Sequence, residues 1–180
     1  MDTNRVTVRY AKALVELAID QNIDKQVYAD MLLIVKAMTE YPAFAEFINN
    51  PAIASIKKSE KVVLAFKTHI QQLTLNFLIL VFNKKREFYL NDICRNALDL
   101  LRQHNHTIVA HLEMSIEPDI EMVQKIKEKF EHKLKQTVEL STTSNPKLIG
   151  GFVFTIDGLQ YDASLATRLK KISKELQQNT

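Results

Sequence analysis

The amino-acid sequence predicts an α+β protein in which an N-terminal bundle of five to six helices precedes a small mixed α/β domain. Between Val6 and His104, apolar residues recur at the three- and four-residue spacing of amphipathic helices. Between Thr107 and Ile116 the pattern changes to alternation, which is typical of a strand with one buried face. We therefore expect two domains, residues 1–105 and residues 106–180.

Breaks in the helical pattern divide the first domain. They fall at Asn22, at Tyr41–Pro42 and at Asn49–Pro51, where turn-forming residues interrupt the apolar spacing. The last helix of the bundle has the clearest pattern, with an apolar stripe on one side and charged residues on the other. The stripe consists of Leu90, Ile93, Cys94, Ala97, Leu98 and Leu101. We expect this face to lie in the core.

The second domain continues, after its first strand, with a helix. Pro118 and the acidic residues Asp119 and Glu121 are favourable at a helix start. The apolar stripe of this helix is Val123, Ile126, Phe130 and Leu134. A short strand follows at Val138–Thr142, and a strand–helix–strand unit normally forms a right-handed crossover.

A hairpin and a final helix complete the second domain. The hairpin joins a strand at Leu148–Ile156 to a returning strand at Leu159–Asp162 through Asp157-Gly158, a dipeptide that adopts the positive φ of a two-residue turn. Ser164 can then cap a last helix. The apolar residues of that helix are Leu165, Leu169, Ile172 and Leu176.

Composition limits the functions that this chain can have. It is 46% hydrophobic, and its 24 basic residues are interspersed with 21 acidic ones, for a net charge of +3, so we expect no nucleic acid partner. Cys94 is the single cysteine, which excludes a disulfide within the chain. The most apolar run, Phe77–Phe82, is far shorter than the about 20 residues that span a bilayer, so we expect no direct membrane insertion.

No pattern of residues indicates catalysis, a bound cofactor or a metal. Gly150–Gly151 lacks the spacing and the Lys-Ser/Thr ending of a phosphate loop, and it predicts a bulge or a close backbone approach. His104, His106 and His111 have no cysteine nearby, so we interpret them as solvated side chains instead of metal ligands. Ser164 has no partnered base and is interpreted as a helix cap.

The first helix carries more apolar surface than one core contact requires. Its polar residues share an arc of about 80°, and its apolar or small residues span about 240°, whereas a helix with one core contact needs an apolar stripe of only ~100°. Those polar residues are Arg5, Arg9, Lys12, Glu16 and Asp20. The segment Leu73–Phe82 is apolar nearly all round, and only Asn76 and Asn83 form a polar strip.

Two explanations fit this surplus. The segment Leu73–Phe82 could run through the middle of the bundle, or part of it could form an exposed apolar groove that receives a helix from a partner. Tyr10 and Phe82 are the kind of aromatic side chain that anchors such a contact.

Four segments, spread over nearly the whole chain, match motifs of one protein family. Three are short: Arg9–Leu14 in the first helix, Asn50–Pro51 in a mid-bundle loop, and Asn76–Arg86 in the fifth helix. The fourth is more specific, with a paired-glycine strand, a hairpin and an Asp-x-Ser helix start, and its signature positions are Gly150, Gly151, Asp162 and Ser164. With these motifs the chain resembles the delta subunit of bacterial F-type ATP synthases, the equivalent of the mitochondrial oligomycin-sensitivity-conferring protein. Ala163 departs from the glycine that is common in the family, which affects the expected loop shape.

The resemblance implies a non-catalytic stator subunit that resists rotor torque during proton-driven ATP synthesis. The N-terminal domain would grip the amino-terminal helices of the alpha subunits on the catalytic head, and the C-terminal domain would engage the b subunits of the peripheral stalk. The partner surface would lie on the first and fifth helices, at Tyr10, Ala13, Leu14, Leu75, Ile79 and Phe82.

The resemblance also implies a location. The N-terminus has neither the plan of a secretory signal nor that of a transit peptide, which favours the bacterial form. Such a subunit would be peripheral, on the cytoplasmic face of the bacterial cell membrane.

The alternative hypothesis is a small helical RNA-binding protein. The basic residues of the last helix motivate it: Arg168, Lys170, Lys171 and Lys174. No aromatic residue is interleaved with these charges to stack on bases, so the stator hypothesis is preferred.

Overall fold

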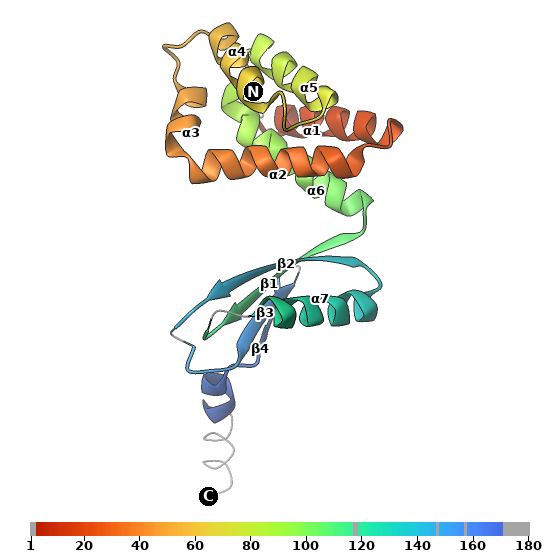
Figure 1. Ribbon diagram of the computed structural model, residues 1–180, viewed down its shortest axis with the longest axis vertical. Helices are drawn as coiled ribbons and strands as arrows, with labels where there is room; N and C mark the ends of the chain where they lie inside the picture. The colour runs from red at the N-terminus through yellow and green to blue at the C-terminus, as the bar shows by residue number, and fades with distance from the viewer. Residues whose placement is uncertain (1–2, 117–118, 147, 157, 171–180) are drawn as a thin grey trace, which may run out of the picture. The chain divides into compact units, whose positions relative to one another are not determined.

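The computed structural model describes residues 3–116, 119–146, 148–156 and 158–170, and it confirms the α+β class. The chain divides into two compact units between His104 and Asn105. The first unit is helical, and the second contains the sheet (Figure 1). Each unit has its own hydrophobic core.

The helical unit contains six α-helices and one short 3-10 helix in its described residues. They are α1 (Thr3–Asp20), α2 (Asp24–Glu40), α3 (Pro42–Asn49), α4 (Ser55–Phe66), α5 (Gln72–Asn83), η1 (Glu87–Tyr89) and α6 (Leu90–His104). The three predicted breaks are confirmed. Asn22 adopts the left-handed φ of 56° after α1, and Pro42 takes the first helical position of α3, where its missing N–H costs no hydrogen bond.

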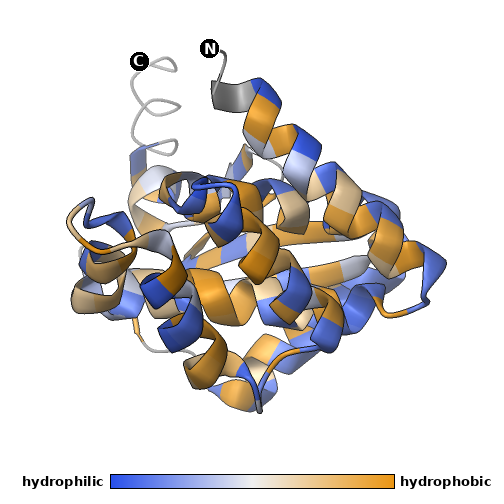
Figure 2. Ribbon diagram, turned by 90° about the horizontal axis from the view of Figure 1, so that it is seen from above, coloured by the Kyte–Doolittle hydropathy of each residue, from blue (hydrophilic) through white to orange (hydrophobic). Residues whose placement is uncertain are grey.

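The core of this unit forms around α6. All six residues of the predicted α6 stripe are buried, and α1 and α2 both pack along this helix. Apolar and polar segments alternate along the helical ribbons (Figure 2), as amphipathic helices require. Because α6 occupies the inner faces of α1 and α2, other apolar residues of α1 are left for a different surface.

The start of α5 is held by a residue of α2. The Asp30 carboxylate Oδ2 accepts hydrogen bonds from the Gln71 backbone N–H at 2.9 Å and from the Thr74 hydroxyl at 2.6 Å. Asp30 and Thr74 are both buried. Gln71, the residue before α5, makes no side-chain cap of its own, so Asp30 supplies the cap from a distance.

The second unit is a four-stranded mixed sheet with one long helix. Its elements are β1 (Thr107–Met114), α7 (Ile120–Leu134), β2 (Thr137–Ser144), β3 (Phe152–Ile156) and β4 (Leu159–Asp162), in the sheet order β2-β1-β3-β4. β1 and β2 are parallel, as the strand–helix–strand pattern predicts. The hairpin is also confirmed, because β3 and β4 are antiparallel and Ile156 pairs with Leu159.

The α7 helix packs against the sheet with only part of its predicted stripe. Phe130 stacks on Phe154 of β3 with ring centroids 4.1 Å apart, and Ile126 also contacts the sheet core. No described side chain of α7 is fully buried, and Leu134 is exposed, so the prediction of a buried stripe that includes Leu134 is wrong. Leu134 is the last residue of α7, and it lies beyond Ile126 and Phe130, the two residues of the stripe that pack on the sheet core.

The paired glycines lie immediately before β3, which is shorter than the predicted strand. Gly151 has a φ of 82°, and a Cβ at this position would overlap the Ala163 carbonyl oxygen. The Phe152 and Gly150 carbonyls accept hydrogen bonds from the Ala163 and Leu165 backbone N–H groups, each at 2.9 Å. The predicted close backbone approach is therefore present, and it joins β3 to the start of the last helix.

A candidate docking groove on the helical unit

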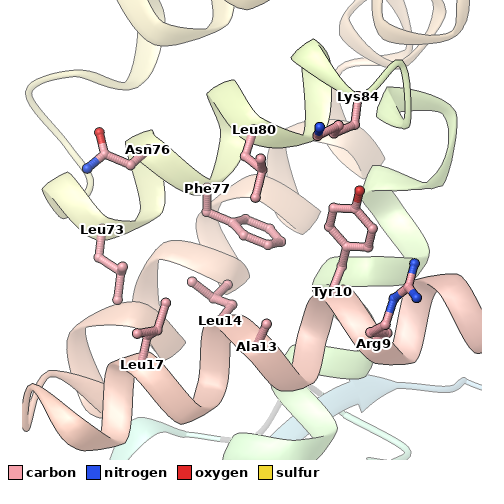
Figure 3. A pocket seen from close by; sticks show the side chains of 10 residues that line it. All are labelled: Arg9, Tyr10, Ala13, Leu14, Leu17, Leu73, Asn76, Phe77, Leu80 and Lys84. Atoms are coloured by element: carbon pink, nitrogen blue, oxygen red, sulfur yellow. The ribbon is translucent and has the colours of Figure 1, made fainter.

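An apolar groove of about 430 Å³ lies between α1 and α5 (Figure 3). Seven of its ten lining residues are apolar or aromatic, and the others are Arg9, Asn76 and Lys84. The full lining is Arg9, Tyr10, Ala13, Leu14, Leu17, Leu73, Asn76, Phe77, Leu80 and Lys84. A concave apolar surface of this kind fits the face of an amphipathic helix.

The floor of the groove is made of packed side chains, and the rim is exposed. On the floor, the rings of Tyr10 and Phe77 meet edge to face with centroids 6.4 Å apart, and Leu14 beneath them is buried. On the rim, Leu17 of α1 is 48% exposed and Leu80 of α5 is 45% exposed. Burial of these two leucines by a partner would remove apolar surface from water, which is the main driving force of association.

The groove exists because α1 has more apolar residues than α6 can cover. Ala11, Val15 and Ala18 are buried on the inner side of α1. Ala13 and Leu17 lie outside that buried stripe, and the small Ala13 side chain leaves space beside Phe77 (Figure 3). The 240° apolar arc of the sequence pattern therefore corresponds to two surfaces, one facing the core and one facing solvent.

The structure places the six predicted partner-binding residues in two groups. Tyr10, Ala13 and Leu14 of α1 line the groove. Leu75 and Phe82 of α5 are buried in the bundle core, and Ile79 is half-buried and does not belong to the lining.

The groove wall on α5 is instead formed by residues that the prediction omitted. They are Leu73, Asn76, Phe77, Leu80 and Lys84. The sequence held a signal for this face, because Leu73 and Leu80 lie three residues before and four residues after Asn76, on the same side of the helix. The polar strip of Asn76 and Asn83 therefore marked the solvent-facing side of α5.

Charge is distributed unevenly along the groove. Arg9 and Lys84 lie near one end together with Tyr10, whereas Leu17, Leu73 and Asn76 lie near the other (Figure 3). None of the ten lining residues is acidic. The Asn76 side-chain oxygen accepts a hydrogen bond from the Gln72 amide at 2.9 Å, so the second end is polar but neutral.

The four signature residues lie in the second unit, where they organise the start of the last helix. Asp162 accepts hydrogen bonds from the Ser164 N–H at 2.8 Å and the Thr167 hydroxyl at 2.7 Å, and hydrogen bonds from Ser164 and Thr167 hold the pKa of Asp162 below its usual value. The Ser164 hydroxyl accepts a hydrogen bond from the Thr167 N–H at 3.3 Å, which confirms it as the cap. Together with Gly150 and Gly151, these residues hold β3 and the end of β4 at the start of the last helix.

Neither a metal site nor a membrane span emerges from the residues that the structure describes. Among them, no three His, Cys, Asp or Glu side chains come together as metal ligands would. Within the same residues, every helix is too short or too polar to cross a bilayer. Of the basic residues that motivated the RNA hypothesis, Arg168 and Lys170 are exposed, and Lys171 and Lys174 lie outside the described residues.

Comparison with known proteins identifies relatives along nearly the full chain. The family described as "ATP synthase delta (OSCP) subunit" matches residues 6–176. The ATP synthase subunit delta of Flavobacterium psychrophilum is 31% identical, over 98% of this chain and 99% of that protein. The corresponding protein of Bacteroides thetaiotaomicron is 29% identical, over 97% of this chain and 95% of that protein.

A solved structure shares the fold. A chain in the cryo-EM structure of the Toxoplasma gondii mitochondrial ATP synthase hexamer matches with a TM-score of 0.68 at 23% identity. The match covers 94% of this chain and 96% of that chain. At this identity the likeness concerns the fold alone.

Proposed function

The chain belongs to the ATP synthase delta (OSCP) subunit family, and we propose that its α1–α5 groove docks the amino-terminal helix of an alpha subunit. As a member of this family it is a non-catalytic peripheral-stalk subunit of an F-type ATP synthase, and its bacterial relatives identify the bacterial form. It joins the catalytic head to the stalk, so that the head resists the torque of the rotor. The observation that supports the docking role is the groove itself, with half-buried Tyr10 and buried Phe77 on its floor and exposed leucines on its rim.

The dimensions of the groove suit a short amphipathic helix. On α1 the lining runs from Arg9 to Leu17, which at 1.5 Å per residue is about 12 Å, or roughly two helical turns. A partner helix with apolar residues at i, i+3 or i+4, and i+7 would place them all along this length. The docked residues would meet Tyr10 and Phe77 on the floor and the two leucines on the rim.

The second unit supplies the other half of the connection in this proposal. Its described surface carries several large apolar side chains, including Ile120, which is 85% exposed, and also Ile149, Leu159 and Leu169. Exposed apolar side chains of this size favour contact with another protein. We assign this unit to the b subunits of the peripheral stalk, with the subunit peripheral on the cytoplasmic face of the membrane.

Substitution of the rim leucines tests the docking role. In the full-length chain, Leu17→Asp and Leu80→Asp should each weaken binding of a synthetic alpha-subunit amino-terminal peptide by about tenfold or more, because each places a charge against the docked apolar face. Both side chains are half exposed, so the bundle should keep its helicity. Isothermal titration calorimetry measures the affinity and circular dichroism measures the helicity.

A matched substitution outside the groove provides the control. Leu64 of α4 is 73% exposed and does not line the groove, so Leu64→Asp should leave the peptide affinity unchanged. Affinity of the unsubstituted chain should fall by no more than about fivefold with added salt, because apolar burial dominates. Failure of that chain to bind the peptide, or equal losses in all three variants, would contradict the proposal.

A further inference from the structure

We infer that Arg9 and Lys84 select an acidic side chain at one end of the docked helix, so that the groove accepts this helix in a single direction. The inference rests on the proposed docking function and adds to it the charge and the orientation of the occupant. It follows from three observations on the lining residues: two cations at one end, no carboxylate that neutralises them, and a neutral opposite end.

The two cations lie on facing walls of the same end. Arg9 belongs to α1, and Lys84 follows the last residue of α5, so each helix contributes one positive charge. In Figure 3 both side chains lie beside Tyr10, away from Leu17 and Leu73. A carboxylate on a helix in the groove would therefore find a cation on either side of it.

Neither cation has a carboxylate partner among the described residues. Among the described residues, the ion pair within α1 joins Lys12 to Glu16 at 3.7 Å, and neither residue lines the groove. Elsewhere in this unit a lysine pairs with a glutamate one turn further along the same helix, as Lys36 does with Glu40. Arg9 and Lys84 thus remain available to a charge from another chain.

The opposite end of the groove has no charged lining residue. Leu17 and Leu73 are apolar, and Asn76 is neutral and already accepts a hydrogen bond from Gln72. The two ends are about 12 Å apart along α1, which exceeds the ~8 Å over which charges at physiological salt are screened. A carboxylate at this end would therefore gain almost no electrostatic attraction from the two cations. The cations thus favour the orientation that places the acidic side chain at their own end of the groove.

Designed peptides test the inference on the full-length chain. Three versions of the alpha-subunit peptide share one apolar stripe; the first has only Gln at its flanking positions, the second a single Glu before the stripe, and the third a single Glu after it. One of the two Glu peptides should bind about two- to fivefold tighter than the Gln peptide, the range of an exposed ion pair, and the other should bind like the Gln peptide. Fluorescence anisotropy of labelled peptides at two salt concentrations measures this difference.

Charge reversal identifies the residues responsible. In the variant Arg9→Glu/Lys84→Glu, the preferred Glu peptide should lose its advantage, and a peptide with Lys at the same position should gain one. The control Arg95→Glu/Lys57→Glu makes the same change in net charge at two exposed residues outside the lining, and it should keep the original preference.

The outcomes separate the two proposals. Equal binding of both Glu peptides, or a preference that survives in the Arg9→Glu/Lys84→Glu variant, overturns the orientation inference and leaves docking intact. Failure of all three peptides to bind overturns docking and the inference together.

Discussion

Charged side chains in the interior of the helical unit are paired with groups that are distant in the sequence. Lys58 is buried, and its ammonium donates hydrogen bonds to the Ile48 carbonyl at 2.7 Å and to the Glu87 carboxylate at 3.3 Å. Ser55 donates to the same carboxylate oxygen at 2.6 Å. Removal of one member of such a pair leaves the other charge buried and unpaired. The free-energy cost of that charge exceeds the stability that the intact pair contributes. These contacts specify how α4 meets η1.

Cys94 is fully buried in α6, and burial raises the pKa of its thiol to about 12. The unfolded chain loses this proton near pH 9, whereas the folded chain keeps it until about pH 12. Between these values the unfolded state binds fewer protons, so stability falls as pH rises. The thiol is neutral at physiological pH and contributes as a small apolar side chain.

Comparison with a variant that lacks the thiol measures this effect. Between pH 9 and pH 10.5, the free energy of unfolding of the unsubstituted chain should fall faster than that of Cys94→Ala, by up to ~1.4 kcal/mol per pH unit. Below pH 8 the difference between the two should be constant, since it then reflects packing alone. Urea denaturation at a series of pH values provides the data, and parallel curves throughout would contradict the buried, protonated thiol.

The α5 helix depends on α2 for its start and in turn builds one wall of the groove. Its first turn contains no acidic residue, and no side chain of α5 or Gln71 caps it. The Asp30 carboxylate satisfies the first-turn groups instead, where a negative charge also interacts favourably with the helix dipole. The position of Leu73 and Phe77 in the groove therefore depends on a residue more than forty positions earlier.

Loss of this cap should affect both stability and docking. Asp30→Ala leaves the buried Thr74 hydroxyl and the Gln71 backbone N–H without this acceptor and should lower the free energy of unfolding by about 1–3 kcal/mol. At temperatures where the variant is still folded, it should bind the alpha-subunit peptide more weakly, because the start of α5 is free to shift. Chemical denaturation and calorimetry measure the two effects.

An exposed aspartate on the preceding helix is the control for this substitution. Asp20→Ala, at the end of α1, should change stability by less than about 0.5 kcal/mol and leave docking unchanged. Peptide affinity equal to that of the unsubstituted chain in folded Asp30→Ala would show that the cap stabilises α5 without positioning the groove.

The chain builds two hydrophobic cores that share no residue. The first lies among α1 to α6, and the second lies between the sheet and α7. The groove belongs entirely to the first unit, whereas Gly150, Gly151, Asp162 and Ser164 belong to the second. In the proposed function the alpha subunit and the b subunits therefore bind two separately packed units.

This separation predicts that damage to the second unit spares the groove. Gly151→Ala should destabilise the second unit by about 1–3 kcal/mol, because a positive φ is strained for alanine and its Cβ would meet the Ala163 backbone. Hydrogen exchange of the β3 and β4 amides should accelerate, while the affinity for the alpha-subunit peptide stays unchanged. A parallel loss of peptide affinity would show that the two units fold as one.

The neighbouring glycine supplies a matched control. A Cβ at Gly150 would meet the Leu165 side chain at 2.6 Å, and a leucine side chain can rotate away at lower cost than backbone. Gly150→Ala should therefore accelerate exchange less than Gly151→Ala does.

Local chemistry made much of this architecture predictable. The end of α1 before Asn22, the start of α3 at Pro42, the buried stripe of α6, the alternation in β1 and the positive φ of Gly158 all depend on residues within a few positions of one another. The same holds for the cap at Ser164. For this reason the α+β class and the order of the elements follow from the amino-acid pattern, and so does the existence of surplus apolar surface on α1.

Contacts between distant residues decided the rest. A segment as apolar as Leu73–Phe82 has no dominant polar face, so its rotation about its axis depends on packing against α1, α2 and α4, which buried Leu75 and Phe82 and exposed Leu80. The cap from Asp30 and the Lys58–Glu87 pair arise from residues that become neighbours only on folding. Periodicity reports how much of a helix is apolar, whereas the direction in which each side chain points is set by the elements that pack around it.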